Sequence, residues 1–380
     1  MFTRRFKLFE LFGFDVNVDL SWFVILALVT WSLATRYFPA DYAAPGLTAG
    51  TYWLLGLAAA LLFFASLLLH EIGHALMARR YALPIRGITL FLFGGVAEMT
   101  EEPPDPRTEF LVAVAGPLVS VALGVLFTGA GLAGRVAGWP PAVNAACLGL
   151  GVVNLALVAF NLIPAFPLDG GRILRSALWR WKGSLRWATR VSSSIGAAFG
   201  FALIALGVLS VLAGDLFGGV WYALIGIFVR NAARMSYQQL LLRKALEGER
   251  IAAFMQRSPV TVERSLSVRE LVDDYVYRHH HKTFPVVDGG RLVGCVSTRE
   301  VRELPREEWD RQTVGAIARP CGDDNTVPPE MDAMQALSLM SRTGASRLLV
   351  ADGDRLLGIL ALKDLMKLFS LKMELGDDDD

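Results

Sequence analysis

The stretch His70-Glu71-Ile72-Gly73-His74 lies inside an apolar run that extends from Leu61 to Leu69 before it and from Ala75 to Ala78 after it. On a helix, His-Glu-x-x-His places two imidazoles one turn apart on the same face, where they can bind Zn²⁺ with the glutamate beside the metal. The apolar flanks are long enough for this helix to cross a bilayer. Because an ionisable group at the centre of a membrane helix costs about 2.5–3.5 kcal/mol, such groups usually have a function. The first hypothesis is therefore a metal-dependent hydrolase with its site inside the membrane.

Composition indicates a membrane part and a soluble part in one chain. Hydrophobic residues make up 53% of the chain and the mean hydropathy is +0.43, yet 19% of residues are charged. The net charge is +1 and no basic stripe is evident, which argues against a nucleic-acid partner. The three cysteines, Cys147, Cys295 and Cys321, have no Cys-x-x-Cys spacing, so neither a disulfide framework nor a thiolate zinc site is predicted.

Six apolar segments have the length of about 20 residues that a membrane helix needs. They are residues 18–37, 53–78, 109–131, 143–163, 191–213 and 217–236. Arginine and lysine concentrate before the first segment and in alternate connections, so the positive-inside rule predicts a multi-pass protein of the plasma membrane with both termini cytoplasmic. Between the second and third segments, residues 88–99 read as two β-prone runs separated by Gly94 and Gly95, which predicts a β-hairpin with the glycines at its turn.

Two histidines leave a catalytic zinc site incomplete, because such sites take three protein ligands. The best candidate for the third is Asp169, in the stretch Asn161-Leu-Ile-Pro-Ala-Phe-Pro-Leu-Asp-Gly-Gly-Arg172 that follows the fourth apolar segment. The prolines end that helix and two glycines follow the carboxylate, so Asp169 is expected on irregular backbone. The second and fourth segments both run toward the cytoplasm, which brings His70, His74 and Asp169 to the same depth.

The chain after about residue 247 has the pattern of a soluble α/β protein with an internal repeat. Residues 284–294 are echoed by residues 347–358, and helical stretches lie on either side of each copy. The predicted organisation is a membrane domain (1–240), a linker (241–250), two repeat domains (251–310 and 311–373) and an acidic disordered tail (374–380).

Together these motifs resemble the site-2 protease family of intramembrane zinc metalloproteases, and the repeat resembles a tandem of cystathionine-β-synthase-type (CBS) domains. The resemblance implies a polytopic α-helical membrane protein of six transmembrane helices with a β-hairpin, followed by a soluble α/β CBS pair. It implies one zinc ion held by His70, His74 and Asp169, with Glu71 as general base. It also implies Asn161 near the scissile peptide and the Gly94–Gly95 hairpin as a strand-pairing surface for a transmembrane protein substrate, in contact with membrane lipids.

The CBS resemblance leaves two functions open. CBS pairs usually bind adenine nucleotides through a Ser or Thr and an Asp three positions later. The first repeat has Ser297 and Thr298 but Glu300 in the place of the aspartate, and the second has Asp364 but Ala361 in the place of the hydroxyl. A nucleotide-sensing regulatory pair, and a structural or dimerising pair that joins chains into a homodimer or higher oligomer, are both consistent with these residues.

A protein of another class, a CBS-regulated membrane transporter or channel that uses the polar cluster as a cation site, is the alternative. Transporters commonly contain inverted repeats and several intramembrane carboxylates, whereas here the intramembrane ionisable residues converge on one three-ligand site. The sequence His279-His280-His281 could bind a metal, but such a run at the end of a surface helix more often faces solvent.

Overall fold

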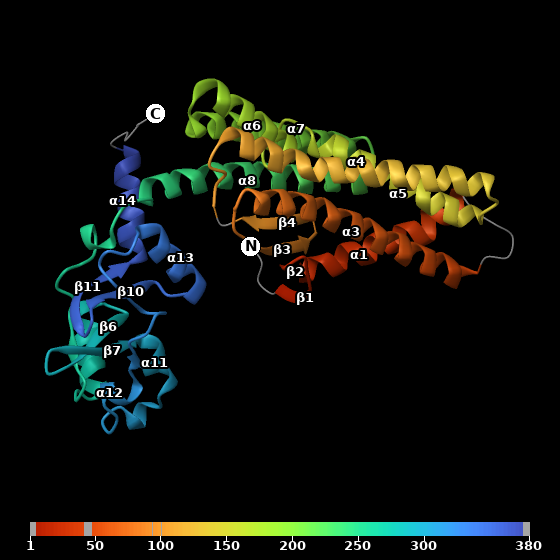
Figure 1. Ribbon diagram of the computed structural model, residues 1–380. Helices are drawn as coiled ribbons and strands as arrows, with labels where there is room; N and C mark the ends of the chain where they lie inside the picture. The colour runs from red at the N-terminus through yellow and green to blue at the C-terminus, as the bar shows by residue number, and fades with distance from the viewer. Residues whose placement is uncertain (1–4, 42–47, 93, 100, 375–380) are drawn as a thin grey trace. The chain divides into compact units, whose positions relative to one another are not determined.

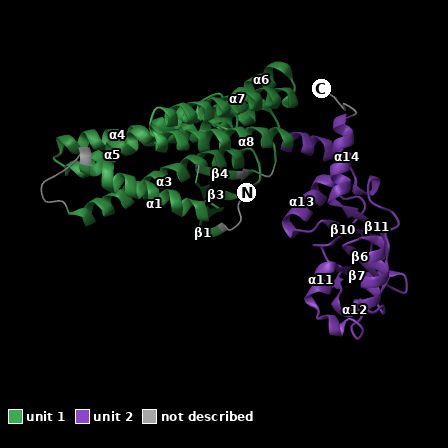
Figure 2. Cartoon of the chain, turned by 180° about the vertical axis from the view of Figure 1, so that it is seen from behind, with its two compact units in different colours: residues 1–238 green, residues 239–380 purple. Residues whose placement is uncertain are grey.

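The computed structural model describes residues 5–41, 48–92, 94–99 and 101–374 (Figure 1). The chain divides into two compact units, Met1–Gln238 and Gln239–Asp380, which Figure 2 distinguishes by colour. Within these ranges, the first unit is helical with one small sheet, and the second contains two small sheets with short helices. Each unit is described by itself.

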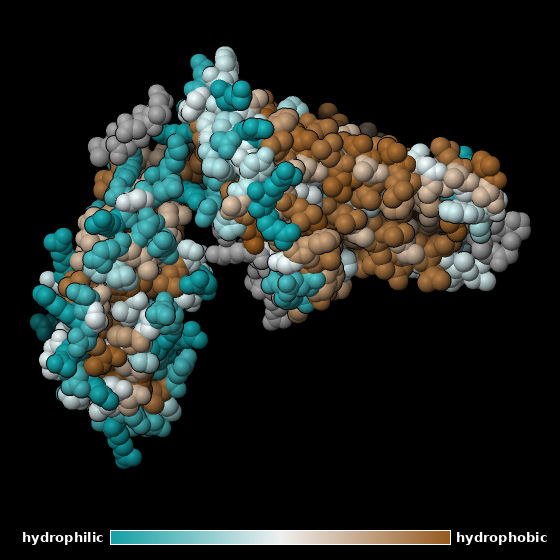
Figure 3. All heavy atoms as spheres, viewed as in Figure 1, coloured by the Kyte–Doolittle hydropathy of each residue, from teal (hydrophilic) through white to brown (hydrophobic). Residues whose placement is uncertain are grey.

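Among the described residues of the first unit, six helices are long and apolar enough to cross a membrane, as the six apolar segments predicted. Their outer surfaces expose many leucine, valine and phenylalanine side chains, and Figure 3 shows apolar residues over most of the visible face of this unit. Such a surface is stable in lipid and not in water. The six are α1 (Leu20–Ser32) with its π-helical continuation (Leu33–Tyr37), α3 (Ala49–Arg80), α4 (Pro106–Val136), α5 (Pro141–Asn161), α7 (Leu185–Leu212) and α8 (Leu216–Leu246), which continues into the second unit. The shorter helices α2 (Phe38–Asp41) and α6 (Asp169–Lys182) are not among these six.

A four-stranded sheet lies beside α3 in the order β1-β2-β3-β4. Its strands are β1 (Arg5–Leu11), β2 (Phe14–Asp19), β3 (Ile85–Phe91) and β4 (Gly94–Met99). The hairpin of β3 and β4 confirms the prediction, but the glycines are not its turn: Gly94 pairs with Phe91 and Gly95 with Leu90, so both glycines belong to β4.

The N-terminal hairpin of β1 and β2 was not predicted. Its signal is the alternation of Phe14, Val16 and Val18, all buried, with the polar residues between them. A run of six residues directly before an apolar helix is easily counted as part of that helix. The antiparallel pairing of β2 with β1 and its parallel pairing with β3, some 70 residues later in the chain, identify this run as a strand.

The expectation that Asp169 lies on irregular backbone was wrong. The irregular segment is 162–168, and Asp169 is the first residue of α6. The prolines do end α5, but a carboxylate in the first turn favours a new helix because it faces the unpaired N–H groups there. Helix α6 is amphipathic, packs against α4 and α7, and ends at Gly183 in the left-handed conformation.

The second unit contains two similar halves, as the repeat predicted. The halves share a buried contact in which Leu292 of the first packs with Leu349 and Ile359 of the second. The strands form the sheets β5-β6-β7-β8 and β11-β10-β9. Their bounds are β5 (Val262–Glu263), β6 (Thr283–Asp288), β7 (Arg291–Ser297), β8 (Arg319–Pro320), β9 (Thr326–Val327), β10 (Arg347–Asp352) and β11 (Arg355–Ala361). The α-helices are α9 (Val268–Glu270), α10 (Tyr277–His279), α11 (Thr298–Glu303), α12 (Val314–Ile317), α13 (Ala333–Thr343) and α14 (Leu362–Glu374).

The predicted linker and tail differ from what the structure describes. Residues 241–246 continue α8, and Leu246 is fully buried in the core of the second half, so they are not a free linker. Glu374 ends α14, and the rest of the predicted acidic tail, residues 375–380, lies outside the described residues.

Candidate metal centre

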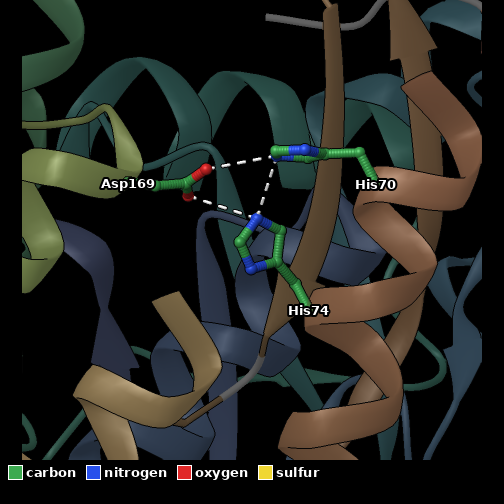
Figure 4. A group of neighbouring side chains, drawn as sticks. All are labelled: His70, His74 and Asp169. Atoms are coloured by element: carbon green, nitrogen blue, oxygen red, sulfur yellow. Dashed lines mark hydrogen bonds and ion pairs between the residues drawn. The ribbon is translucent and has the colours of Figure 1, made fainter. Parts of the chain in front are cut away.

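Helix α3 directs two histidine side chains at one point inside the first unit (Figure 4). His70 is 1% exposed and His74 is 5% exposed, and their Nε2 atoms are 3.2 Å apart. Residues of α4 contact both Nδ1 atoms. His74 Nδ1 donates to the Val112 carbonyl at 2.7 Å, and His70 Nδ1 lies 2.9 Å from Ser120 Oγ. Because a partner at Nδ1 fixes the ring orientation, both Nε2 atoms are available to a metal.

Asp169 completes the group from the start of α6. Its Oδ2 lies 3.1 Å from His70 Nε2 and its Oδ1 lies 3.2 Å from His74 Nε2. Burial by itself would raise the pKa of Asp169, but the neighbouring His74 and His70 rings, through charge and hydrogen bonds, hold this pKa below its ordinary value. The carboxylate is therefore ionised at neutral pH, which is the form that binds a cation.

The donor set fits a zinc ion. One atom from each of His70, His74 and Asp169 lies within 4.8 Å of the others, and no second group of three such donors occurs in the described ranges. Ligands at about 2.0–2.1 Å from a tetrahedral zinc would be about 3.3 Å from one another, close to the separations found here. The absence of a side chain at Gly116 of α4 leaves room for the two Nε2 atoms, because a Cβ there would collide with His74 Nε2 and lie 2.7 Å from His70 Nε2.

Glu71 and the metal-donor side chains line one cavity of about 460 Å³. Glu71 lies against β4, since a Cβ at Gly95 would be only 2.6 Å from Glu71 Cγ. Asn161, the last residue of α5, and Gly94 line the same cavity. The remaining lining is mostly aromatic and aliphatic, and Arg172 adds a cation that contacts Met99 Sδ at 3.9 Å. The structure thus brings all the membrane-site residues of the sequence analysis to one cavity.

The start of α6 is fixed tightly to the segment before it. A Cβ at Gly170 would collide with the Leu162 and Ile163 carbonyls, and one at Gly171 would collide with the backbone of Phe166. The two glycines after Asp169 therefore allow the start of α6 to pack closely against the backbone of the preceding segment, and this packing holds the Asp169 carboxylate in place.

Several residues around the centre were not found from the sequence. They are the α4 residues Glu109, Val112, Gly116 and Ser120, which lie at helical spacing along one face; Glu109 and Ser120 are polar and Gly116 has no side chain. The spacing of Glu109, Gly116 and Ser120 on one face of a membrane helix is the signal that could have been used. We refer to these four residues as the α4 stripe.

The predicted nucleotide residues of the second unit are engaged in helix starts. Ser297 Oγ donates to Glu300 Oε2 at 2.5 Å, and the Ser297 N–H donates to the same carboxylate at 2.8 Å, forming a capping box for α11. Thr298 is the first residue of α11. In the other half, Asp364 Oδ2 accepts from the Ala361 N–H at 3.0 Å. Glu300 and Asp364 thus occupy equivalent positions in the two halves, since each carboxylate accepts from the backbone N–H three residues earlier.

His279 and His281 have ring centroids 6.0 Å apart and pack near Tyr275 and Phe284, respectively. His280 lies between them in the left-handed conformation. Within the part of the chain that the structure describes, this run does not form a three-donor cluster.

Comparison with known proteins matches each of the two units to a known family. A model of Peptidase family M50 matches residues 58–146 and 142–206, and a model of the CBS domain matches residues 251–307 and 314–371. The chain is 38% identical to the putative zinc metalloprotease Rip3 of Mycobacterium tuberculosis, over 94% of this chain and 91% of that protein. It is 35% identical to the putative zinc metalloprotease sll0528 of Synechocystis, over 96% of this chain and 95% of that protein. It also resembles the solved site-2 protease from Methanocaldococcus jannaschii, at 27% identity and a TM-score of 0.44, over 62% of this chain and 95% of that one.

The fold and the sequence relatives define a multi-pass membrane zinc metallopeptidase of the site-2 protease type with tandem CBS domains. The chain belongs to peptidase family M50. This membership favours the peptidase over the transporter or channel that the sequence left as an alternative.

Proposed function

We propose that this chain is an intramembrane endopeptidase in which His70, His74 and Asp169 hold one zinc ion. The observation that carries the proposal is the convergence of these three donors, at 3.1–3.2 Å from one another, with Glu71 in the same cavity. When bound, zinc supplies Lewis-acid chemistry, because it polarises a carbonyl oxygen and lowers the pKa of water to about 7.

Glu71 is the proposed general base. Glu71 directly follows His70 on α3, the helix that carries both histidines, and it lines the cavity in which a substrate peptide and water can meet. Its carboxylate accepts the proton of the attacking water and then returns that proton to the nitrogen of the leaving amine, so it ends the cycle unchanged. The Asn161 amide at the cavity wall can donate to a carbonyl of the substrate near the scissile bond.

The substrate is proposed to be a membrane-spanning protein held on strand β4. A transmembrane helix hides its peptide groups in hydrogen bonds, so it must unwind before hydrolysis, and in lipid the released groups need new partners. Strand β4 ends the strand order of its sheet and lines the cavity, so its backbone can pair with an extended segment by β-augmentation. Gly94 and Gly95 allow close approach at this strand, with Glu71 directly beside Gly95.

We place the site near the cytoplasmic face of the plasma membrane, with both termini cytoplasmic. The support is the alternation of basic connections, among them Arg79 and Arg80 at the end of α3. Both the helix that carries the histidines and α5, which precedes Asp169, run toward that face in this orientation. Cleavage near the cytoplasmic end of the substrate helix follows, where water reaches the site most easily.

The CBS pair is proposed to regulate the peptidase or to join two copies of the chain. The resemblance to CBS domains implies an adenine nucleotide as the ligand, with Ser297, Thr298 and Asp364 as the contacting residues. We propose residues 251–310 and 311–373 as the limits of the two CBS domains.

The test is the variant Glu71→Gln, which removes the base and keeps the size of the side chain. We expect it to trap a membrane protein substrate in cells, which mass spectrometry can then identify. With the purified full-length protein and that substrate, we expect Glu71→Gln to lower kcat by about 10²–10⁴-fold while zinc content stays at the wild-type level. Glu101→Gln, at an exposed loop position, is the matched control and should be fully active. Retained cleavage by zinc-loaded Glu71→Gln would overturn the proposed mechanism.

A further inference from the structure

Helix α6 carries a buried arginine that no feature of the proposed chemistry uses. Arg175 is 4% exposed, and its Nε and Nη2 atoms both lie 2.5 Å from Glu109 Oε1 of α4. Its Nη2 also lies 3.2 Å from Glu102 Oε2, and its guanidinium stacks 5.0 Å from the Phe166 ring centroid. These contacts join α6 to α4, to the loop before α4 and to the segment that precedes α6.

Glu109 belongs to the α4 stripe, which also contains the groups that orient the histidines. From Glu109, the next members follow at intervals of three, four and four residues, so all four lie along one face of the helix. Val112 and Ser120 hold the two Nδ1 atoms, and Gly116 leaves room for the two Nε2 atoms. One face of α4 thus positions both histidines and, through Arg175, the helix that carries Asp169.

Burying the ion pair between Arg175 and Glu109 requires the desolvation of two charged groups, which is unfavourable in free energy. Glu109 is 0% exposed, and its Oε2 has no hydrogen-bond partner among the described residues. Because desolvation offsets most of the attraction in a buried pair, apolar side chains of similar size often stabilise a fold equally well or better. What a fork-shaped guanidinium does provide is a fixed geometry, since it bonds a carboxylate in few orientations.

We propose that Arg175 and Glu109 are positioning residues that set the location of Asp169 relative to His70 and His74, and thereby the affinity for zinc. The inference rests on the proposed function in so far as these three residues are the zinc ligands. Asp169 and Arg175 are six residues apart on one helix, so a shift of α6 along α4 would move the carboxylate away from the two Nε2 atoms. Partners of metal ligands typically affect affinity by about 10–100-fold.

The test measures zinc affinity of the purified full-length protein in detergent by competition with a chromophoric chelator, together with the visible spectrum of the Co²⁺-substituted protein. We expect Glu109→Gln and Arg175→Lys to weaken zinc binding by about 10–100-fold and to alter the Co²⁺ bands. The double variant Glu109→Gln/Arg175→Met removes both charges, so it should fold even if a single variant does not, and it should show the same weak binding.

Two controls and one further measurement separate positioning from general stability. Arg180→Met changes an exposed arginine of the same helix, and Glu101→Gln changes an exposed carboxylate in the loop before α4; both variants should bind zinc as the wild type does. A purely structural role would lower the Tm of the metal-free protein and leave the zinc-induced rise in Tm unchanged. A positioning role reduces that rise.

The outcomes are distinct. If the double variant folds and binds zinc with wild-type affinity and an unchanged Co²⁺ spectrum, the positioning role is wrong and the proposed function stands. If the wild-type chain binds no zinc that depends on His70, His74 and Asp169, the proposed site itself is wrong.

Discussion

Gly116 determines whether the two histidine side chains can reach the same point. Its Cα faces both Nε2 atoms so closely that no Cβ fits between α4 and α3 at this level. Gly95 has the corresponding relation to the Glu71 carboxylate from the side of β4. Two glycines on different elements therefore define the space around the metal donors and around the proposed base.

Gly116→Ala should abolish zinc binding without altering any donor. The added methyl group would lie 2.7 Å from His70 Nε2 and closer still to His74 Nε2, so both rings must leave their positions. Zinc content by atomic absorption and cleavage of the trapped substrate check this expectation. The matched control is Gly129→Ala, at an exposed position of the same helix with no heavy atom within 4 Å of the added carbon. Full zinc content in Gly116→Ala would contradict the geometry of the site.

Gly95→Ala should separate zinc binding from catalysis. A Cβ at this position would be 2.6 Å from Glu71 Cγ, so the proposed base moves while the three metal donors do not. We expect kcat to fall by about 10²-fold with unchanged zinc affinity, the opposite pattern to Gly116→Ala. Equal loss of zinc in the two variants would show that Glu71 and the donors are not independent.

At the scale of elements, α4 is the scaffold of the centre. It begins at Asp105, whose carboxylate accepts from the Thr108 N–H at 3.0 Å and from Thr108 Oγ1 at 2.6 Å. Pro106 follows at the first helical position, where its missing N–H costs nothing. The α4 stripe starts four residues after this cap, so a frayed first turn would reach Glu109.

Asp105→Ala should destabilise the first unit by about 1 kcal/mol, the usual value of a helix cap. The hydrogen bonds from Thr108 hold the pKa of Asp105 below its ordinary value of 3.8. Because the folded-state pKa is lowered, the stabilisation is present above pH 3.8 and is lost as the pH falls through the folded-state value. Thermal unfolding of wild type and variant at a series of pH values should give a constant difference in Tm near neutral pH, which narrows only in strong acid. A difference that closes between pH 6 and 8 would exclude this cap as its origin.

For the whole molecule, the residues proposed for each ligand lie in separate compact units. The proposed zinc donors are in Met1–Gln238, and the proposed nucleotide residues are in Gln239–Asp380. Ligand binding stabilises the folded state by RT ln(1 + [L]/Kd), about 2.7 kcal/mol at a hundred times Kd.

Calorimetry of the full chain should therefore show two unfolding transitions with different ligand responses. We expect zinc to raise the Tm of the first unit only, and AMP, if the CBS pair binds it, to raise that of the second only. Asp364→Ala should remove the AMP effect and leave the zinc effect unchanged. A rise of both transitions with zinc alone would instead reveal coupling between the metal centre and the CBS pair.

The fold class could be predicted because its signals are local. Six segments of sufficient length and hydropathy define six membrane helices whatever their neighbours are, and the two copies of the repeat define two similar halves. The two metal motifs could be combined because alternate basic connections put His70 and Asp169 at the same depth. The sequence by itself thus determined the class of protein and the residues that meet at its centre.

What only the tertiary structure decided depends on partners far away in the chain. The strand β2 pairs with β3, some 70 residues later in the chain, as well as with β1, and Gly95 of β4 lies against Glu71 rather than in a turn. The roles of Ser120 and Val112 follow from the contact of α4 with α3 at that level, and the role of Arg175 from a carboxylate 66 residues earlier. Hydropathy and spacing describe each helix separately, whereas the packing of helices decides which of their faces meet around the metal donors.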